Sequence, residues 1–216
     1  MSVEMRKLGH IRIIMYVMSY VVGIDEAGRG PLAGPVSVGV VKILYPEQSR
    51  GAMKKFFFGI KDSKKLTPED RELWFALALE AKKQKLLDFA VSLVSERIID
   101  KKGIVYAVRL GIKRCLQKLN IEEDSQIFLD GSLEAPKQFK HQQTIIKGDE
   151  KIPVISLASI CAKVIRDKRM VRLSAKFPQF SFHLHKGYGT LAHRQALQKY
   201  GPTLIHRRSF LRHLTK

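Results

Sequence analysis

Apolar positions along the chain predict strands that come first as a block and later between helices. The run VVGI at 21–24 and the run VSVGVVKIL at 36–44 are rich in β-branched residues, and they predict two strands that pair as a hairpin. A third strand is predicted over residues 87–94, where apolar and polar positions partly alternate. Shorter apolar segments at 126–129 and 144–146 predict two more strands.

Helices are predicted where apolar side chains recur every three or four residues. Thr67 has the residue type of an N-cap and Pro68 that of a first helical position, so a helix is expected to begin there and to run to about Lys85. Its expected apolar side consists of Leu73, Trp74, Leu77 and Ala81. Later helices are predicted over residues 104–119, 155–173 and 191–200, the last of which is stopped by Gly201 and Pro202.

The order of these elements predicts the fold class. The helix over 104–119 is amphipathic, and its stripe of Val105, Val108, Ile112 and Cys115 is expected to be core. The three phenylalanines at 56–58 fit a short strand or a packed loop. Antiparallel strands followed by strands that alternate with helices predict an α/β fold, in which helices flank a mixed central sheet and a helical segment lies at the C-terminal end.

The charge balance indicates the kind of partner that the protein binds. Among the 216 residues, 39 are Lys or Arg and 20 are Asp or Glu, which gives a net charge of +19. So large a basic excess favours a polyanionic partner, most often a nucleic acid and less often an anionic membrane. Cys115 and Cys161 lie in apolar, helix-like settings and match no metal-binding spacing. They are expected to be reduced core thiols in a cytoplasmic protein.

The N-terminal residues bear on localisation and domain organisation. They faintly resemble a signal peptide, but Arg12 interrupts the apolar run and no small-residue cleavage site follows. No run of about 18 apolar residues is present, so no membrane span is expected. Met18 is an alternative start of the chain. We expect a monomer with one domain over residues 18–216, including the C-terminal helical segment, and an extension over residues 1–17.

Three acidic positions share one local context. Asp25, Asp130 and Asp149 each follow an apolar strand and lie close to a glycine. Ligands collect at the strand ends of open α/β sheets, so these carboxylates are expected to converge there. Each acid taken alone fits a turn residue equally well, but the shared context favours a site. Carboxylate oxygens suit Mg²⁺ or Mn²⁺ rather than zinc, and a pair of such ions promotes in-line phosphoryl transfer.

The residues around Asp25 add to this chemistry. Glu26 follows directly, and burying two carboxylates at a strand end is costly unless a cation lies between them. Neighbouring strand residues point to opposite faces, so the strand is expected to twist or to end at Glu26 if both acids reach one site. Gly28 and Gly30 let the backbone approach a ligand closely, and Arg29 offers a planar fork suited to phosphate. The segment therefore predicts metal-dependent phosphate chemistry.

The segment YVVGIDEAGRGPLAGP at 20–35 closely resembles the signature of bacterial ribonuclease HII, the type 2 ribonuclease H that nicks RNA within RNA–DNA duplexes. The resemblance continues, in the family's order, in the blocks DSKKL (62–66), FLDG (128–131), KGD (147–149), ASICAKVIRD (158–167), HKGYGT (185–190) and HRRSF (206–210). From first to last these blocks span nearly the whole chain, and the ordered set is specific to that family.

The resemblance implies a ribonuclease H-like fold and an active site. Four carboxylates would be both catalytic and metal-binding: Asp25, Glu26, Asp130 and Asp149. The implied cofactors are Mn²⁺ or Mg²⁺, in a two-metal-ion hydrolysis that leaves a 5′-phosphate and a 3′-hydroxyl. The implied substrates are RNA–DNA hybrids and duplex DNA with embedded ribonucleotides, which would be nicked on the 5′ side of the ribonucleotide, as in ribonucleotide excision repair.

The resemblance also implies how substrate is bound. Gly28, Arg29 and Gly30 would hold the nucleotides around the scissile phosphate. Tyr188 would stack near the sugar of the deoxynucleotide that follows the ribonucleotide. Only the 2′-hydroxyl separates a ribonucleotide from its deoxy neighbours, so close backbone and tyrosine contacts at that sugar make physical sense.

Other polar residues are weaker candidates for substrate binding. Lys64 and Lys163 belong to matching blocks; a solvated turn is an equal alternative for Lys64 and its neighbour Asp62, and an ordinary ion pair with Asp167 is the default for Lys163. Four histidines near the C-terminus suggest zinc, but they have no cysteine or acid at ligand spacing, so phosphate contact or packing is favoured. They are His183, His185, His193 and His206.

Two further functions compete with the ribonuclease. A non-catalytic nucleic-acid-binding protein of this fold would be expected to have lost an acid, yet all four are present in context. Another nuclease or recombinase of the same fold would leave the GRG and GYGT blocks without explanation. Ribonuclease HIII has an N-terminal binding domain and a different glycine loop, so GRG favours ribonuclease HII. The sequence thus predicts a metal-dependent endoribonuclease.

Overall fold

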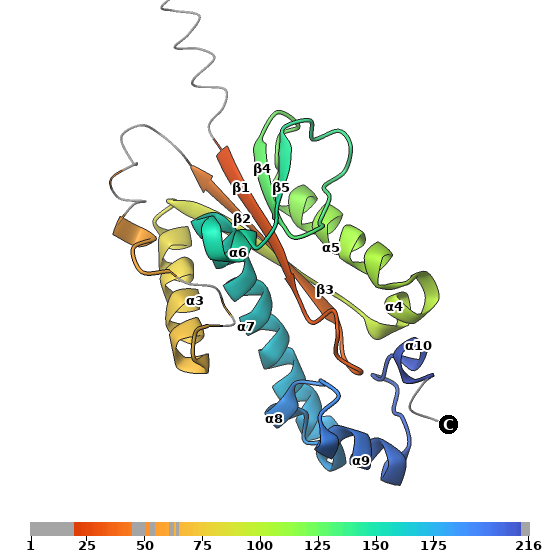
Figure 1. Ribbon diagram of the computed structural model, residues 1–216. Helices are drawn as coiled ribbons and strands as arrows, with labels where there is room; N and C mark the ends of the chain where they lie inside the picture. Colours follow the sequence, from red (N-terminus) through yellow and green to blue (C-terminus); the bar gives the residue numbers. More distant parts are fainter. Residues whose placement is uncertain (1–19, 45–50, 52–54, 61–62, 64, 213–216) are drawn as a thin grey trace, which may run out of the picture.

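A computed structural model describes residues 20–44, 51, 55–60, 63 and 65–212 (Figure 1). The extension over residues 1–17, the alternative start Met18 and the candidates Asp62 and Lys64 lie outside the described residues.

A five-stranded mixed sheet forms the centre of the fold, in the order β3-β2-β1-β4-β5. The strands are β1 (Tyr20–Ala27), β2 (Val36–Leu44), β3 (Leu87–Val94), β4 (Gln126–Asp130) and β5 (Gln142–Ile145). β2 pairs antiparallel with both β1 and β3, whereas β4 runs parallel to both β1 and β5. The hairpin and the mixed sheet are therefore confirmed, and β2 and β3 have the predicted bounds.

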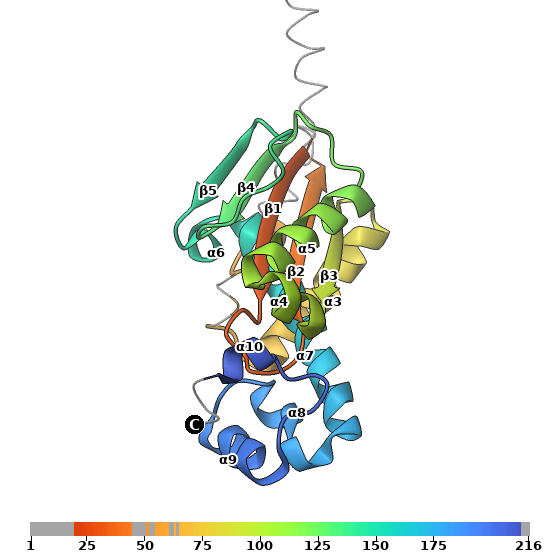
Figure 2. The same cartoon turned by 90° about the vertical axis from the view of Figure 1, so that its right-hand side faces the viewer.

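Helices cover both faces of this sheet. They are α3 (Pro68–Lys83), α4 (Glu96–Lys102), α5 (Ile104–Lys118), α6 (Gly148–Lys151), α7 (Pro153–Lys176), η2 (Pro178–Phe180), α8 (Phe182–His185), α9 (Leu191–Tyr200) and α10 (Arg208–Leu211). Figures 1 and 2 show α3 and α7 on one face, α4 and α5 on the other, and α8 to α10 beyond the end of the sheet. None of the described helices combines the length and apolar character needed to cross a membrane.

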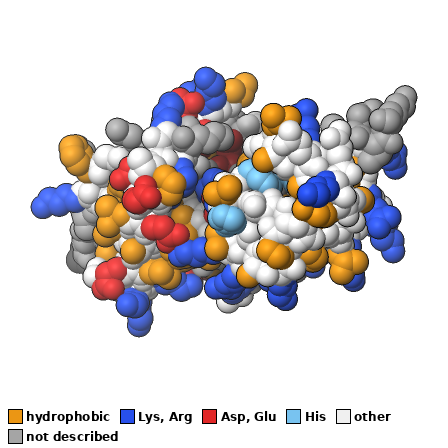
Figure 3. All heavy atoms as spheres, turned by 90° about the horizontal axis from the view of Figure 1, so that it is seen from below, with side chains coloured by type: hydrophobic (Ala, Val, Ile, Leu, Met, Phe, Trp, Pro, Cys, Tyr) orange, Lys and Arg blue, Asp and Glu red, His pale blue; other side chains and the backbone are white. Residues whose placement is uncertain are grey.

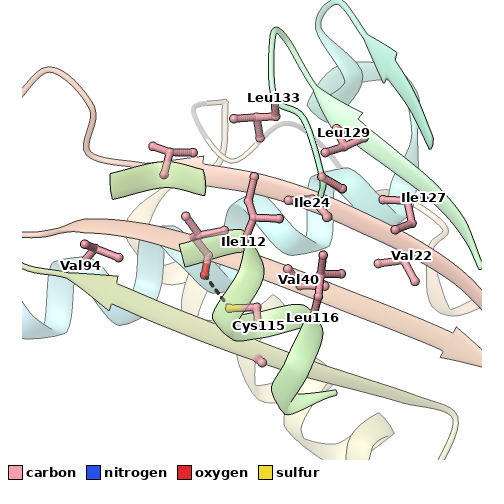
Figure 4. Packing of buried hydrophobic residues seen from close by; sticks show 14 of the residues in the cluster. Val22, Ile24, Val40, Val94, Ile112, Cys115, Leu116, Ile127, Leu129 and Leu133 are labelled. Carbon is pink, nitrogen blue, oxygen red and sulfur yellow. Dashed lines mark hydrogen bonds between the residues drawn. The ribbon is translucent and has the colours of Figure 1, made fainter. Parts of the chain in front are cut away.

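Two hydrophobic cores fill the spaces between the sheet and the helices on its two faces. In Figure 4, Val22, Val40 and Ile127 of the sheet pack against α5, where the Cys115 thiol donates a hydrogen bond to the Val38 carbonyl. The second core joins α3 and α7 to the opposite face and contains Cys161. Both cysteines are free and buried, and burial raises the pKa of each thiol to about 12. Both therefore stay protonated at neutral pH, in agreement with their expected place in the core.

The predicted start of α3 is confirmed, but only Ala81 and, in part, Trp74 of its predicted apolar side are buried. Thr67 accepts a hydrogen bond from the Asp70 amide, and the Asp70 side chain bonds back to the Thr67 amide, which completes a capping box. The Leu73 and Leu77 side chains, expected in the core, are 59% and 41% exposed. The buried residues of the helix are Phe75, Ala78 and Ala81. Apolar residues occur all round this helix, so contact with the sheet and α7 selects the buried side.

A further expectation is wrong and another is confirmed in part. Val105 begins the predicted core stripe of α5 but is 52% exposed, because it lies in the first turn, before the helix packs on β2 and β3. Val108, Ile112 and Cys115 are buried as expected. The phenylalanines at 56–58 form no strand; Phe56 and Phe57 pack against the second core, as a packed loop would, whereas Phe58 is exposed.

Glycines let α7 lie directly on the sheet. A Cβ atom added to Gly23 of β1 would lie 2.5 Å from the Val154 carbonyl group. One added to Gly39 of β2 would lie 2.2 Å from the carbonyl oxygen of Ala158. Backbone therefore meets backbone at these two points. Because Gly39 is the register partner of Asp25, this close contact also sets the distance between α7 and Asp25.

Candidate active site and metal centre

Parallel pairing brings the first two candidate aspartates to one end of the sheet. Ile24 of β1 is in register with Leu129 of β4, so Asp25 and Asp130 follow at equivalent positions on adjacent strands. Of the two expected alternatives, a twist or an end at Glu26, the second is wrong, because β1 continues to Ala27. Neighbouring residues on a regular strand point to opposite faces, yet the Asp25 and Glu26 side chains stay within hydrogen-bond reach of each other.

Asp149 joins Asp25 and Asp130 from the short helix α6, which follows β5. It is the second residue of α6, which follows Lys147 in the left-handed conformation, with φ of 54°. The Gly148 and Asp149 amides donate hydrogen bonds to Asp130 Oδ1 at 2.7 and 3.3 Å. The Asp130 carboxylate therefore anchors the turn that carries Asp149, and the two acids are positioned together.

The three aspartates form a compact acidic group, called here the aspartate trio. One carboxylate oxygen from each of Asp25, Asp130 and Asp149 lies within 4.8 Å of the others. Asp25 and Asp149 are buried, and Asp130 is partly buried. Among the described residues, this is the one group of His, Cys, Asp or Glu side chains with the spacing of a metal site.

The electrostatics of Asp25 favour a cation at this place. Burial raises the pKa of Asp25 well above its usual value, and repulsion from Glu26 and Asp130 raises it further. A hydrogen bond from Ser159 opposes the shift, and the Ser159 hydroxyl also bonds to the buried Ser63 hydroxyl at 2.8 Å. Clustered, buried carboxylate oxygens are the donor set of a hard divalent cation, which would remove the repulsion between them. The residues therefore fit a Mg²⁺ or Mn²⁺ site.

Glu26 lies beside the trio but not within it. Burial raises the pKa of Glu26, while Arg29, at 3.4 Å between Nη1 and Oε1, opposes that rise. Repulsion from Asp130 contributes to the raised pKa, so the two carboxylates feel each other electrostatically. The role of Glu26 as a metal ligand stays a prediction.

The predicted substrate-binding residues lie on two segments that the structure brings together. Gly28, Arg29 and Gly30 begin the glycine loop, residues 28–35, and the Leu32 amide of this loop donates a hydrogen bond to the Gly187 carbonyl at 2.8 Å. Tyr188, 42% exposed, therefore lies on a segment bonded to the loop.

Lys163 is half-buried beside this tyrosine. Its ammonium lies 5.9 Å from the Tyr188 ring centroid and 2.8 Å from Asp167 Oδ2. The i,i+4 ion pair considered from the sequence is therefore present, and it leaves Lys163 within reach of the tyrosine. Figure 3 shows Lys and Arg side chains around much of the outline of the face seen from below.

Sequence reasoning missed three residues that support these segments. Arg166 and Arg207 are fully buried and bond to the glycine loop, and Ser159 bonds to Asp25. All three lie inside blocks that carry the family resemblance. The available signal was a charged or polar side chain within an otherwise apolar block such as ASICAKVIRD.

Three of the four C-terminal histidines pack with one another, and the exposed His183 bonds to Ser174. His193 and His206 are buried, with their Nε2 atoms 3.1 Å apart, and His185 stacks on His193 at 4.5 Å between ring centroids. His193 bonds to the Tyr188 carbonyl, and His206 accepts a hydrogen bond from the Thr203 amide. Packing, one of the two roles favoured from the sequence, is therefore what these three histidines show.

Acid is expected to destabilise this histidine cluster. Burial, with repulsion from His193, lowers the pKa of His206 to about 4, below its usual value near 6.5. The fold thus favours the neutral ring, so its contribution to stability is complete above about pH 6.5 and is lost as the pH falls toward about 4. Thermal unfolding followed from pH 8 to pH 4 should show a melting temperature that falls below pH 6.5. His206→Gln should flatten this fall; an unchanged pH profile would contradict the prediction.

The fold and the site together define a class of protein. A mixed sheet of this strand order, with acidic side chains gathered where β1 and β4 end, is a ribonuclease H-like fold that carries a site for metal-dependent hydrolysis of phosphodiesters. Comparison with known proteins gives the family. Residues 22–213 match the family described as Ribonuclease HII.

Individual relatives agree with this match. Ribonuclease HII from Caldicellulosiruptor bescii is 42% identical over 195 residues, which are 90% of this chain and 88% of the relative. Ribonuclease HII from Endomicrobium trichonymphae is 42% identical over 190 residues, 88% of this chain and 84% of the relative. The solved ribonuclease H2 from Pyrococcus horikoshii has a TM-score of 0.63 and 30% identity, covering 88% of this chain and 93% of that one.

The chain belongs to the ribonuclease HII family. It is accordingly a ribonuclease H, an endonuclease that produces 5′-phosphomonoesters (EC 3.1.26.4).

Proposed function

We propose that this ribonuclease hydrolyses the RNA strand of RNA–DNA hybrids and nicks duplex DNA on the 5′ side of embedded ribonucleotides. The observation that carries the proposal is the aspartate trio, with oxygens within 4.8 Å, at the end of the strand that leads into the glycine loop. The products would be a 5′-phosphate and a 3′-hydroxyl. The net charge of +19 supports a duplex substrate, because phosphate contacts supply affinity that does not depend on sequence.

Asp25, Asp130 and Asp149, with Glu26 beside them, would hold two Mg²⁺ or Mn²⁺ ions. Such ions, when bound, stabilise charge on the reacting phosphate and activate a water for attack. The protein contributes rigid placement: the bond from Ser159 orients the Asp25 carboxylate, and two amides orient that of Asp130. Carboxylates held in this way need little rearrangement when a cation binds.

Substrate recognition is proposed to use both the glycine loop and the segment of Tyr188 that is bonded to it. Gly28, Arg29 and Gly30 would hold the scissile phosphate, with Arg29 leaving Glu26 to do so. The half-exposed Tyr188 ring would stack on a sugar, and Lys163 beside it would bind a neighbouring phosphate. Lys64 is proposed to bind the substrate backbone on the basis of its block in the sequence.

The test is a cleavage assay on three labelled duplexes of one sequence: DNA with one ribonucleotide, an RNA–DNA hybrid, and DNA alone. We expect cleavage 5′ to the ribonucleotide and within the hybrid with Mg²⁺ or Mn²⁺, none in EDTA, and none of DNA alone. Tight, salt-sensitive binding without cleavage would instead indicate a binding protein. Cleavage of DNA alone would indicate a different nuclease specificity.

Gly30→Ala is expected to separate activity from stability. A Cβ atom added to Gly30 would have none of the described atoms within 4 Å apart from its chain neighbours, so the melting temperature should match that of the wild type. The added methyl would nevertheless lie on the open side of the loop, where substrate is proposed to approach, and cleavage should fall about tenfold or more. Steady-state cleavage and thermal unfolding check this. Full activity would contradict a close approach of substrate to Gly30.

We propose a cytoplasmic monomer in which residues 18–216 form one catalytic domain and residues 1–17 are dispensable for it. The third hydrophobic cluster supports a single domain, because it joins Ala33 of the glycine loop to Met170 of α7 and Ile205 near the C-terminus. A chain that begins at Met18 should fold and cleave like the full chain, and light scattering should give the mass of one copy.

A further inference from the structure

Two buried arginines grip the glycine loop from behind. Arg166, in the middle of α7, and Arg207, between α9 and α10, are both 0% exposed. Arg166 donates hydrogen bonds from Nε, Nη1 and Nη2 to the carbonyls of Pro35 (2.9 Å), Lys186 (3.0 Å) and Ala33 (3.3 Å). Arg207 donates from the same three atoms to the carbonyls of Gly34 (2.9 Å), Arg29 (2.7 Å) and Gly28 (2.7 Å).

Carbonyl groups, more than carboxylates, surround these two charges. Within the described residues, Asp167, at 4.0 Å, is the one carboxylate that approaches Arg166, and none lies at ion-pair distance from Arg207. Burial and repulsion from Arg166 lower the pKa of Arg207 to about 9, which still leaves it charged at neutral pH. Burying two like charges side by side is costly. A role beyond packing would account for the presence of two buried guanidinium groups here.

The bonds from Arg207 determine which way the loop amides point. In a trans peptide the carbonyl and the following amide point in opposite directions. Arg207 holds the carbonyls of Gly28 and Arg29, so the amides of Arg29 and Gly30 point away from it. Neither amide has a hydrogen-bond partner in the described part of the chain. The guanidinium charge behind these peptides also polarises them, which strengthens their amides as donors to an anion.

The two glycines of the GRG block serve this arrangement in different ways. Gly28 has φ of 87°, and a Cβ atom there would lie 1.9 Å from Arg166 Nε, so the loop packs directly on the guanidinium. Gly30 has open space around it. The loop thus has a side filled by arginine and a side free for ligand.

Arg166 also links the loop to the tyrosine. Its bond to the Lys186 carbonyl holds the segment that leads to Tyr188, and its guanidinium carbon lies 5.8 Å from the Tyr188 ring centroid. The Arg166 side chain therefore contacts both the glycine loop, where phosphate is proposed to bind, and the segment of Tyr188, and it sets the distance between them.

We propose that Arg166 and Arg207 are positioning residues for substrate: they aim and polarise the Arg29 and Gly30 amides toward the phosphate at the ribonucleotide and hold Tyr188 at a set distance from them. The inference rests on the proposed function, in which this loop binds the scissile phosphate. Neither arginine touches substrate, because both are fully buried. Their effect is on recognition of the ribonucleotide, in addition to any effect on folding.

The experiment compares Arg207→Gln with the wild type. Dissociation constants are measured in EDTA for a duplex with one ribonucleotide and for the all-DNA duplex of the same sequence, and kcat and KM are then measured with Mg²⁺. We expect the preference for the ribonucleotide duplex to fall about tenfold and KM to rise by a similar factor, because misaimed donors lose the contacts that distinguish the site. Affinity for all-DNA duplex should change little, since surface charge supplies it.

A matched control separates positioning from stability. Leu116→Ala removes a buried side chain from the core around α5, far from the loop, and should lower the melting temperature without changing the ribonucleotide preference or KM. Arg207→Lys keeps the charge but replaces the fork with a single ammonium, so an intermediate loss is expected. This variant also serves if Arg207→Gln fails to fold.

The outcomes are distinguishable from failure of the proposed function. If the wild type neither prefers nor cleaves the ribonucleotide duplex, the proposed function itself is wrong. If the wild type does both and a folded Arg207 variant keeps the wild-type preference and KM, the function stands and the positioning role is overturned.

Discussion

Asp25→Asn is expected to reduce cleavage more than about 100-fold. The substitution preserves size and the oxygen that accepts the Glu26 amide at 2.7 Å, but it removes the charge that the aspartate trio offers to a cation. Replacing a residue that merely supports a metal ligand costs about ten- to a hundredfold, so replacing a ligand should cost more. Initial rates on the duplex with one ribonucleotide measure this effect.

The same variant is expected to be more stable than the wild type without metal. In the folded protein the pKa of Asp25 is raised by burial and by repulsion from Glu26 and Asp130. Ionisation therefore destabilises the fold as the pH rises through the unfolded-state value of about 3.9 toward the raised value, and at neutral pH asparagine removes that penalty. Each kcal/mol relieved should raise the melting temperature by about 2–4 °C in a chain of this size.

Two comparisons make this result decisive. Mg²⁺ or Mn²⁺ should raise the melting temperature of the wild type and have little effect on that of Asp25→Asn, because binding to the native state is what stabilises it. Asp88→Asn, at an exposed aspartate paired with Lys82, should leave both activity and the metal response unchanged. An active Asp25→Asn enzyme would remove the aspartate trio from the mechanism.

Gly39→Ala is expected to cause a large loss of stability. The new methyl would lie 2.2 Å from the Ala158 carbonyl oxygen, a backbone atom of α7 that no side-chain rotation can move away. Helix and sheet must separate, which we expect to cost about 3 kcal/mol and to lower the melting temperature by roughly 6–12 °C. Circular dichroism during heating measures the shift.

This substitution should also reduce activity in the fraction that remains folded. Ser159, next to Ala158 on α7, bonds to Asp25, and Gly39 is the register partner of Asp25. Lifting α7 would therefore withdraw a hydrogen bond from a carboxylate of the trio. The control is Gly30→Ala, which adds the same methyl where no atom is within 4 Å. Equal melting temperatures for the two variants would refute the close backbone contact.

Local patterns predicted the elements that carry strong local signals. The β-branched run of β2 and the apolar run of β3 have the bounds that the sequence indicates, and so does α9, which Gly201 ends. Thr67 and Pro68 marked the start of α3, because capping depends on neighbouring backbone groups alone. Short helices such as α4 and α6 were missed, because helices of a few residues have too few periodic positions to recognise.

The candidate site was predictable in its composition but not in its geometry. Asp25, Asp130 and Asp149 were recognisable because each follows an apolar strand near a glycine. Their convergence depends on the parallel pairing of β1 with β4, a contact between segments about a hundred residues apart. Glu26 shows the limit of the sequence, because only the structure shows that its carboxylate lies between the Asp25 side chain and the guanidinium of Arg29.

The sequence by itself determined the strands, the main helices, the family and the acids of the candidate site, because these depend on residue type and near neighbours. Only the tertiary structure decided which side of α3 is buried, since apolar residues surround that helix and packing selects among them. It also decided that Arg166 and Arg207 lie inside the protein. A charged side chain can be buried only where enough polar groups converge on it, and here those groups are carbonyls of the glycine loop, more than a hundred residues away in the chain.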